Sequence, residues 1–295
     1  MRRQIIVVFF SLICLALPSA FGADRGALFK VTAQGHTMYL FGTMHAGQPA
    51  FYPLESRITA AVAGASMLAL EVDPGIDPAG VAKALKSYGM VAPDSSSPPM
   101  PPTLKARVSK AADRAGINGG AIAQFKPWLV ATVLAMAEYA TQGYRPDLSV
   151  DSHLSQLARQ AKVPVVSLES IDSQMSLFNR LSDAQQMRLL EESVDQIESG
   201  KQGAEVRQVV DAWRNADRPA LDAIAARVAG DTTVFGQFFK KVLLDERNVL
   251  MADKLLAMLK QDDKVVAAIG VLHLVGSNSV PELLSARGVA VERVY

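Results

Sequence analysis

Two of the four histidines in this 295-residue chain lie in the same short motif, Gly-x-x-His. The first copy is Gly42-Thr43-Met44-His45 and the second is Gly270-Val271-Leu272-His273. Each copy follows an apolar stretch and is followed closely by another glycine. A glycine at the end of a strand permits a tight turn and a close approach of the backbone. The motifs therefore predict that His45 and His273 lie in strand-end turns, where imidazole nitrogens can bind a divalent metal ion.

Two glutamates end two further apolar stretches. Glu71 follows residues 67–70, and Glu169 follows residues 163–168. The carboxyl ends of parallel strands meet at one edge of an α/β sheet, where ligands bind. Two histidines and a carboxylate at that edge would suit Mn, Fe, Co or Zn and would leave positions open for water. Each glutamate could instead cap a helix or pair with an arginine, which is the commoner fate of such residues.

Three other residues of suitable chemistry lack this context. His36 and His153 do not belong to a Gly-x-x-His motif, and we expect them on a strand face and on a helix surface, respectively. Arg247 follows two acidic residues in a segment of helical periodicity. A surface ion pair, which contributes little to stability, is the simplest interpretation of that arginine.

The remaining sequence must supply the elements that bring these residues together. Apolar stretches predict five strands, at residues 36–41, 67–70, 163–168, 265–269 and 289–294. Amphipathic stretches with capping residues, proline or glycine at their ends predict helices at residues 77–89, 126–143, 182–200, 217–230, 233–260 (as one helix or two) and 278–288. This alternation predicts an α/β fold with a central, mostly parallel or mixed β-sheet flanked by helices, and a helical insertion before the last strands. We expect residues 23–295 to form a single domain.

Composition limits the classes of function. The chain has 30 Lys and Arg against 29 Asp and Glu, a net charge of +1, which excludes the basic surface of a nucleic-acid-binding protein. Hydrophobic residues make up 49% of the chain, as in a globular protein with a sizeable core. A single cysteine excludes an internal disulfide and every Cys-rich metal site. A metal site must therefore use histidines and carboxylates.

The N-terminal segment has the features of a cleaved export signal. It starts with two arginines, continues with an almost entirely apolar run at residues 5–17, and reaches Ala20-Phe21-Gly22, which fits the small-x-small rule of signal peptidase. We expect residues 1–22 to be removed after Gly22, and the mature protein to be periplasmic or secreted. The apolar run is too short for a permanent membrane span, and it contains the single Cys14. The mature chain would then have no cysteine and no permanent membrane span.

The set and order of these blocks resembles the TraB/GumN family. The resemblance rests on Leu40-Phe41-Gly42-Thr43-Met44-His45, the stretch ending at Glu71, Ser167-Leu168-Glu169 with Gln174, Glu246-Arg247-Asn248, and Gly270-Val271-Leu272-His273-Leu274-Val275-Gly276. It extends over nearly the whole mature chain. That family is in turn similar to the Tiki metalloproteases and to the ChaN-like and erythromycin-esterase-like fold.

The resemblance implies a divalent-metal site and a metal-dependent peptidase activity. His45 and His273 would be metal ligands, and Glu71 would be the carboxylate ligand or the general base. We expect a hydrolysis in which Glu71 or Glu169 accepts a proton and Arg247 stabilises the developing oxyanion.

The chain departs from the family pattern at two places. It has Ser149-Val150-Asp151 where the family usually has Gly before Val-Asp, and Ala216-Asp217 after Trp213 where the family usually has Gly-Asp. We expect both places to lie in helical regions away from the metal ligands. The resemblance leaves undefined the roles of Asp151, Gln174 and Asn248.

The predicted function is therefore that of an exported divalent-metal-dependent hydrolase, with a peptide or an exported protein segment as its substrate. One alternative is a binding protein that holds a metal, haem or peptide in the same pocket without turnover. The other is a hydrolase of a non-peptide ester or a polysaccharide substituent. Aromatic residues are only 6% of the chain, and no cluster of them marks a sugar-binding platform. The metal and the oligomeric state are not specified by the sequence.

Overall fold

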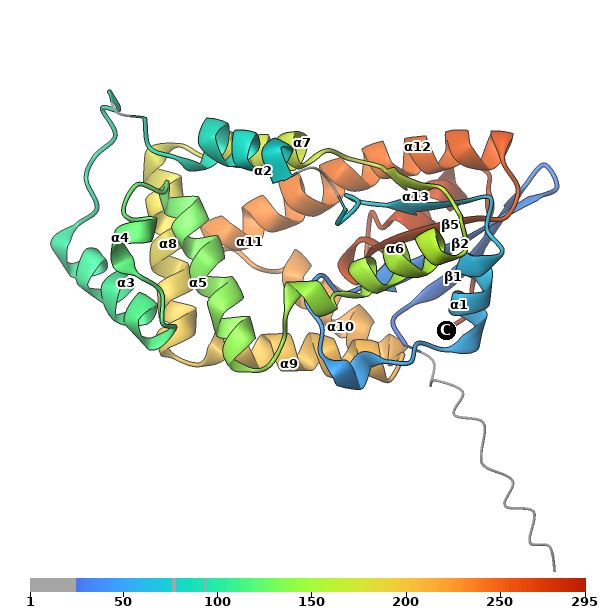
Figure 1. Cartoon of the computed structure of the whole chain (residues 1–295), viewed down its shortest axis with the longest axis horizontal. Coiled ribbons are helices and arrows are strands. Elements are labelled where there is room, and N and C mark those ends of the chain that lie inside the picture. Colours follow the sequence, from blue (N-terminus) through green and yellow to red (C-terminus); the bar gives the residue numbers. More distant parts are fainter. Residues whose placement is uncertain (1–24, 76–77, 93) are drawn as a thin grey trace, which may run out of the picture.

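The computed structural model describes residues 25–75, 78–92 and 94–295. Within this part of the chain, six strands form one mixed sheet in the order β4-β3-β5-β2-β1-β6. The strands are β1 (Leu28–Ala33), β2 (His36–Thr43), β3 (Met67–Leu70), β4 (Val165–Ser167), β5 (Val265–Gly270) and β6 (Ala290–Arg293). The sheet is flanked by helices, so the predicted α/β class is confirmed (Figure 1). The predicted signal peptide, residues 1–22, lies outside the described residues.

Four neighbouring strands of the sheet are parallel. β2 pairs with β5, β5 pairs with β3, and β3 pairs with β4, all in parallel register. Every residue of β5 is buried, and its sequence of valine, alanine, isoleucine and glycine fits a strand that is covered on both faces. Because these strands run in one direction, the residues that follow β2, β3, β4 and β5 meet at one edge of the sheet.

The strand β1 was not predicted from the sequence. It pairs antiparallel with β2 through a tight hairpin whose central residues, Gln34 and Gly35, both have positive φ angles, of 52° and 85°. Such a turn suits the twist of a hairpin, but it is usually signalled by Asn-Gly or Asp-Gly. Lys30 and Thr32 also interrupt the apolar residues of β1, which makes the strand less conspicuous in the sequence.

Thirteen α-helices are present in the described residues. They are α1 (Ser56–Ala63), α2 (Pro78–Ala84), α3 (Pro102–Arg114), α4 (Gly119–Ile122), α5 (Pro127–Thr141), α6 (Val150–Gln160), α7 (Ile171–Ser176), α8 (Asp183–Glu198), α9 (Lys201–Arg214), α10 (Arg218–Ala229), α11 (Val234–Phe238), α12 (Arg247–Gln261) and α13 (Val280–Ala286). Helices α3, α4, α5 and α8 group at the end of the molecule away from the sheet (Figure 1). None of the described helices is long and apolar enough to cross a membrane.

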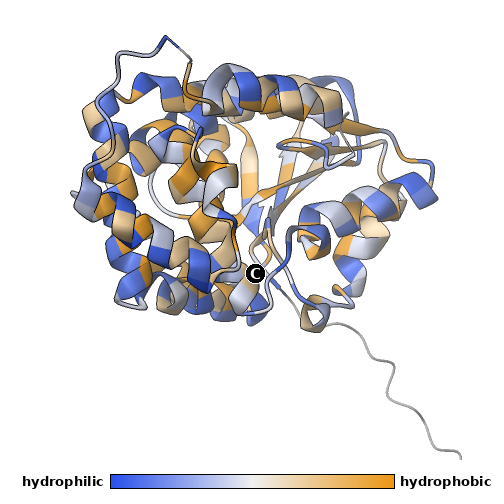
Figure 2. Ribbon diagram, turned by 60° about the vertical axis from the view of Figure 1, so that its left-hand side comes forward, coloured by the Kyte–Doolittle hydropathy of each residue, from blue (hydrophilic) through white to orange (hydrophobic). Residues whose placement is uncertain are grey.

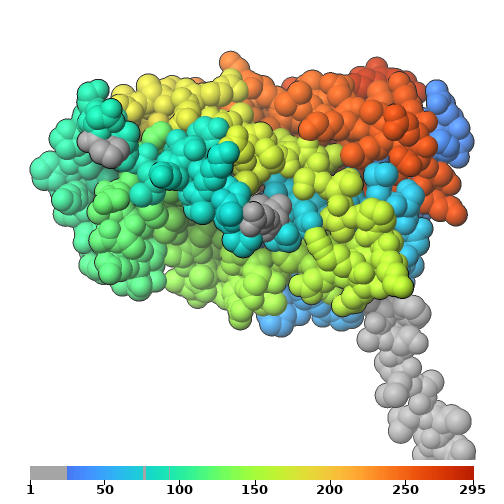
Figure 3. All heavy atoms as spheres, turned by 45° about the horizontal axis from the view of Figure 1, so that its top comes forward, coloured from blue at the N-terminus to red at the C-terminus, as the bar shows by residue number. Residues whose placement is uncertain are grey.

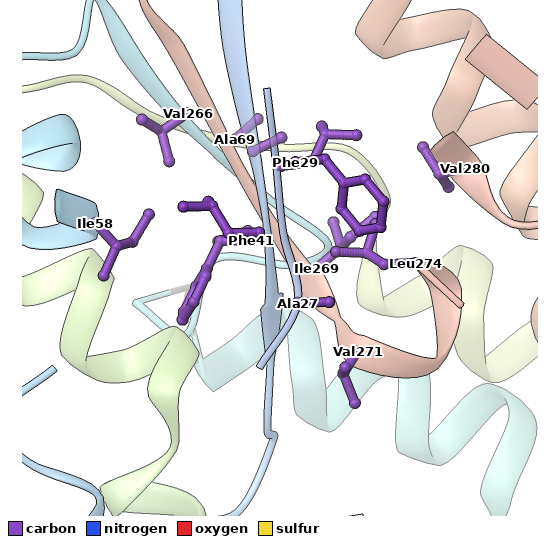
Figure 4. Close-up of a cluster of buried hydrophobic side chains, with 14 of the residues drawn as sticks. Ala27, Phe29, Phe41, Ile58, Ala69, Val266, Ile269, Val271, Leu274 and Val280 are labelled. Atoms are coloured by element: carbon purple, nitrogen blue, oxygen red, sulfur yellow. The ribbon is translucent and has the colours of Figure 1, made fainter. Parts of the chain in front are cut away.

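Two hydrophobic clusters hold these layers together. The larger one surrounds the sheet: Phe41 of β2 points toward Ile58 of α1 on one side, and Phe29 of β1 lies near Leu274 and Val280 on the other (Figure 4). Burying a side chain of this size stabilises the fold by about 1.5–3 kcal/mol. The smaller cluster joins α3, α5 and α8. Hydrophobic residues accordingly line the strands and the inward faces of the helices (Figure 2).

The segments that follow Glu71 and Glu169 also contact each other beyond the carboxyl edge of the sheet. Glu71 precedes α2, and Glu169 precedes α7. These two helices pack against each other, and their residues lie side by side on the surface (Figure 3). A hydrogen bond of 3.1 Å from the Tyr88 hydroxyl to Asp172 Oδ2 joins the two segments. The two glutamates are thus fixed by converging parts of the chain.

The predicted helix at residues 233–260 is divided in the structure. A π-helix, Phe239–Glu246, separates α11 from α12. Within it, Lys240 Nζ lies 2.5 Å from Asp245 Oδ1. π-helical segments are rare and often accompany functional sites. This one ends immediately before Arg247, so its geometry determines the direction in which the first residues of α12, Arg247 and Asn248, project from the helix.

Candidate metal centre

His45 lies just beyond β2 and is held through its Nδ1 atom. That atom is 3.0 Å from Oδ2 of Asp151, in the first turn of α6. The other carboxylate oxygen of Asp151 accepts a hydrogen bond of 2.8 Å from the Thr43 hydroxyl. Because an ionised carboxylate can only accept, the proton of a neutral His45 ring is placed on Nδ1. The lone pair is then on Nε2, as is usual for a histidine that binds metal with a carboxylate behind it.

His273 is held in the same way by an amide. It ends the 3-10 turn Val271–His273 after β5, and its side chain is only 5% exposed. Its Nδ1 lies 2.5 Å from Oδ1 of Asn248. The Nδ2 of Asn248 donates a hydrogen bond of 2.8 Å to the carbonyl of Asn278, and this bond fixes which end of the amide faces the histidine. The lone pair of a neutral His273 is therefore also on Nε2.

Both free ring nitrogens point at one oxygen of Glu71. The distances to Glu71 Oε1 are 3.5 Å from His45 Nε2 and 3.8 Å from His273 Nε2. Both exceed the usual length of an N–H···O hydrogen bond. Two atoms that each lie about 2.1 Å from one zinc-like ion can be at most about 4.2 Å apart, so both pairs fall within the limit for a shared ion. The third contact of Oε1 is the amide of Gly270, at 2.6 Å.

The glycines of the two motifs leave room that a side chain would fill. A Cβ atom on Gly270 would lie 3.0 Å from both Glu71 Oε1 and His45 Nε2. A Cβ atom on Gly42 would lie 2.9 Å from the side chain of Val271, so the two motifs pack directly against each other. The described residues contain no set of three His, Cys, Asp or Glu side chains already gathered as a metal cluster. The donor types, the orientation of both rings and the space beside Gly270 nevertheless fit a divalent ion held by His45, His273 and Glu71.

Arg247 joins the two glutamates. Its Nη2 lies 2.5 Å from Oε2 of Glu71 and 2.5 Å from Oε2 of Glu169. Its Nε lies 3.0 Å from both oxygens of Glu169, which also accepts a hydrogen bond of 3.0 Å from Gln174. The side chain of Arg247 is 12% exposed. The surface ion pair expected from the sequence is therefore wrong, because this arginine is buried between two strand-end carboxylates.

The charges of the cluster shift the pKa of each member. Burial would raise the pKa of Glu71, but its interactions with His273, His45 and Arg247 outweigh this effect and hold the pKa well below its ordinary value. Partial desolvation lowers the pKa of His45, but the carboxylates of Asp151 and Glu71 outweigh this and raise it well above its ordinary value. Burial lowers the pKa of His273 to about 4, so this ring is neutral at neutral pH. A neutral His273 is ready to serve as a ligand, whereas His45 must give up a proton.

The first of the two departures from the family pattern, Ser149-Val150-Asp151, lies next to the site, so the expectation that it is remote is wrong. Asp151 contacts His45 directly, and Ser149 caps the helix that carries it by accepting from the Ser152 amide at 3.1 Å. Trp213 is fully buried, and its Nε1 donates a hydrogen bond of 2.7 Å to the carbonyl of Gly42. Asp151 and Trp213 therefore both support the segment that leads from β2 to His45.

The other two histidines serve the scaffold. His36 starts β2, and its Nδ1 lies 2.9 Å from the carbonyl of Leu259. His153 is on α6, as expected, and its ring packs against Tyr52 with centroids 4.3 Å apart. The three residues without a defined role now have partners: Asp151 contacts His45, Asn248 contacts His273, and Gln174 contacts Glu169. Nothing local in the sequence could have assigned these partners, because each pair joins different elements or a loop and a helix.

The fold and the site together define an α/β protein in which two histidines and a glutamate converge at the carboxyl ends of neighbouring parallel strands. The chain belongs to the TraB/PrgY/gumN family, whose model matches residues 27–293. Among curated proteins it is similar to "Uncharacterized protein YbaP" of Escherichia coli (strain K12) and to the protein of the same name from Shigella flexneri. Each is 25% identical over 254 residues, which is 83% of this chain and 87% of the relative. No solved structure matches the chain significantly.

Proposed function

We propose that the chain is an exported, divalent-metal-dependent hydrolase that cleaves peptides or exported protein segments. The observation that carries this proposal is the convergence of His45 Nε2 and His273 Nε2 on Glu71 Oε1, at 3.5 Å and 3.8 Å. Asp151 and Asn248 hold the two rings from behind, which leaves Nε2 of each neutral ring free for a ligand role. Mn, Fe, Co and Zn all accept such a donor set.

The residues beside this donor set favour hydrolysis over binding alone. The chemistry that a divalent cation supplies when bound is the activation of water near neutral pH and the polarisation of a carbonyl group. With Glu71 used as a ligand, Glu169 is the carboxylate left to accept a proton from water. Arg247 touches both glutamates and offers a positive charge for a developing oxyanion.

Export and the substrate class are supported by the sequence. The basic start, the apolar run and the small-x-small site of residues 1–22 favour removal of a signal peptide and a periplasmic or secreted location. A substrate outside the cytoplasm is then a peptide or another exported protein. The similarity of the family to the Tiki metalloproteases points to the same substrate class.

Metal analysis combined with a peptide-library assay tests this proposal. Purified mature protein is expected to contain about one equivalent of a divalent metal and to cleave peptides, and chelation should abolish the cleavage. Glu169→Gln should lose the cleavage even when it is saturated with metal, because the proton acceptor is removed. Stoichiometric metal without any cleavage would favour a binding protein, and cleavage of esters or oligosaccharides in the same screen would favour the non-peptide alternative. Absence of bound metal would overturn the proposal.

A further inference from the structure

Arg247 supplies the positive charge that lies between Glu71 and Glu169 in the metal-free chain. Oε2 of Glu71 and Oε2 of Glu169 each lie 2.5 Å from its Nη2, so the two oxygens are at most twice that distance apart. The side chains of Glu71 and Glu169 are 6% and 10% exposed. Two buried carboxylates at such a separation repel each other unless a cation lies between them. The guanidinium therefore makes the charge arrangement stable without a metal.

The guanidinium of Arg247 makes more hydrogen bonds to Glu169 and Leu243 than it makes to Glu71. An arginine has five N–H donors. Nε and one Nη2 hydrogen face Glu169, and Nη1 donates to the carbonyl of Leu243 at 3.0 Å. A single contact, from Nη2 at 2.5 Å, joins Arg247 to Glu71. If that contact breaks, Glu169 and Leu243 still hold the arginine in place.

Glu169 is itself fixed, so it can act as this permanent partner. Gln174 donates a hydrogen bond of 3.0 Å to Oε2 of Glu169. The backbone amide of Glu169 donates a hydrogen bond of 2.8 Å to the carbonyl of Glu71. The carbonyl of Leu168 accepts a hydrogen bond from Lys254 of α12. The strand end that carries Glu169 is thus tied both to β3 and to α12.

We propose that Arg247 is the resident cation of the metal-free site, and that a divalent ion displaces it from Glu71 while Glu169 and Leu243 retain it beside the site. This inference rests on the proposed function in that it takes a divalent ion as the ligand. It adds a consequence for catalysis: the Nη2 hydrogen that faces Glu71 is free for a substrate oxygen only after the ion has bound. The metal-free chain would therefore have a cation between its two glutamates and would lack its oxyanion donor.

The inference is tested by measuring metal affinity in variants of Arg247 and of Glu169. The affinity should rise in the first and fall in the second. The probes are Zn²⁺ and Mn²⁺ alone, added to the chelator-treated full chain and followed by titration calorimetry. Arg247→Met removes the competing charge at similar length, so it should bind both ions at least tenfold more tightly. Its metal-free form should melt at a lower temperature than the wild type, and saturation with Zn²⁺ should close that gap. Glu169→Gln should bind about tenfold more weakly, because Arg247 loses its retaining partner and stays on Glu71.

A matched control and two substitute variants ensure that each result either supports or contradicts the inference. Arg180→Met removes an exposed arginine that is paired with Glu246, and it should leave both affinities unchanged. If Arg247→Met does not fold, Arg247→Gln is measured in its place. If neither folds, the affinity of Glu169→Gln alone tests the inference. Equal or weaker binding by the Arg247 variants, or unchanged binding by Glu169→Gln, would overturn the inference. Failure of the wild type to bind would overturn it together with the proposed function, whereas the expected affinities without any cleavage would overturn the hydrolase alone.

Discussion

The carboxylate of Asp151 lies 3.0 Å from Nδ1 of His45, although 106 residues separate the two in the sequence. This contact links the first turn of α6 to the turn after β2. It determines which nitrogen keeps its proton when the ring is neutral, and so which nitrogen is left to face Glu71. The orientation of a proposed ligand is thus controlled by a residue that does not itself face the metal position.

Asp151→Asn should lower the affinity for divalent metal by about 10–100-fold, the usual effect of losing such a supporting partner. An amide in this place is uncharged and can also donate, so it no longer specifies the proton position on His45. Titration calorimetry with Zn²⁺ measures the change. Asp147→Asn, at an exposed aspartate paired with Arg145 just before α6, is the matched control and should bind like the wild type.

His45→Ala and His273→Ala should each remove the bound metal while the chain still folds. His45 is exposed on 61% of its side chain, so its removal leaves no large cavity in the core. Elemental analysis measures the metal, and circular dichroism checks the fold. His36→Ala should retain the metal, since its ring contacts the carbonyl of Leu259 far from the cluster in the sheet. Stoichiometric metal in both ligand variants would refute the assignment.

Gly270→Ala should abolish metal binding without a backbone penalty. The φ angle of Gly270 is −51°, which alanine adopts readily, so the effect would come from the added methyl group. That group would lie 3.0 Å from both Glu71 Oε1 and His45 Nε2. Gly80→Ala, in α2, meets no atom within 4 Å and serves as the control for an added methyl group. Wild-type affinity in Gly270→Ala would place the metal elsewhere.

His273 should make the metal-free protein sensitive to mild acid. Burial lowers its pKa to about 4 in the folded chain, whereas an unfolded histidine titrates near 6.5. Between these values the unfolded state binds more protons at this residue, so the contribution of His273 to stability falls as the pH falls, by about 2 kcal/mol at pH 5. Denaturant unfolding at pH 7 and pH 5, with chelator present, measures this loss. His273→Gln should lose less stability on this change of pH than the wild type does, and His36→Gln should behave like the wild type.

The sequence was most informative where chemistry and local structure coincide. Gly-x-x-His after an apolar strand is a local signal, and the structure brings His45 and His273 to neighbouring strand ends as that signal predicted. The fold class followed equally from the alternation of strands and helices. Only the family resemblance placed Arg247 at the site, because its nearest neighbours in sequence are acidic, while its actual partners, Glu71 and Glu169, follow other strands. A preference for local ion pairs cannot reveal a residue whose burial depends on the packing of α12 on the sheet.

The position of β5 also determines when the site can form. This strand occupies the middle of the sheet, between β2 and β3, yet it is among the last elements to be synthesised. Until it inserts, β2 and β3 each present an unpaired edge, and His45 and Glu71 have no common support. Such long-range pairing is slow because a long loop must close first. If the chain binds a divalent ion as proposed, a chain that ends before His273 would lack one of the proposed ligands, so metal uptake would report that β5 and the turn after it have been made and inserted.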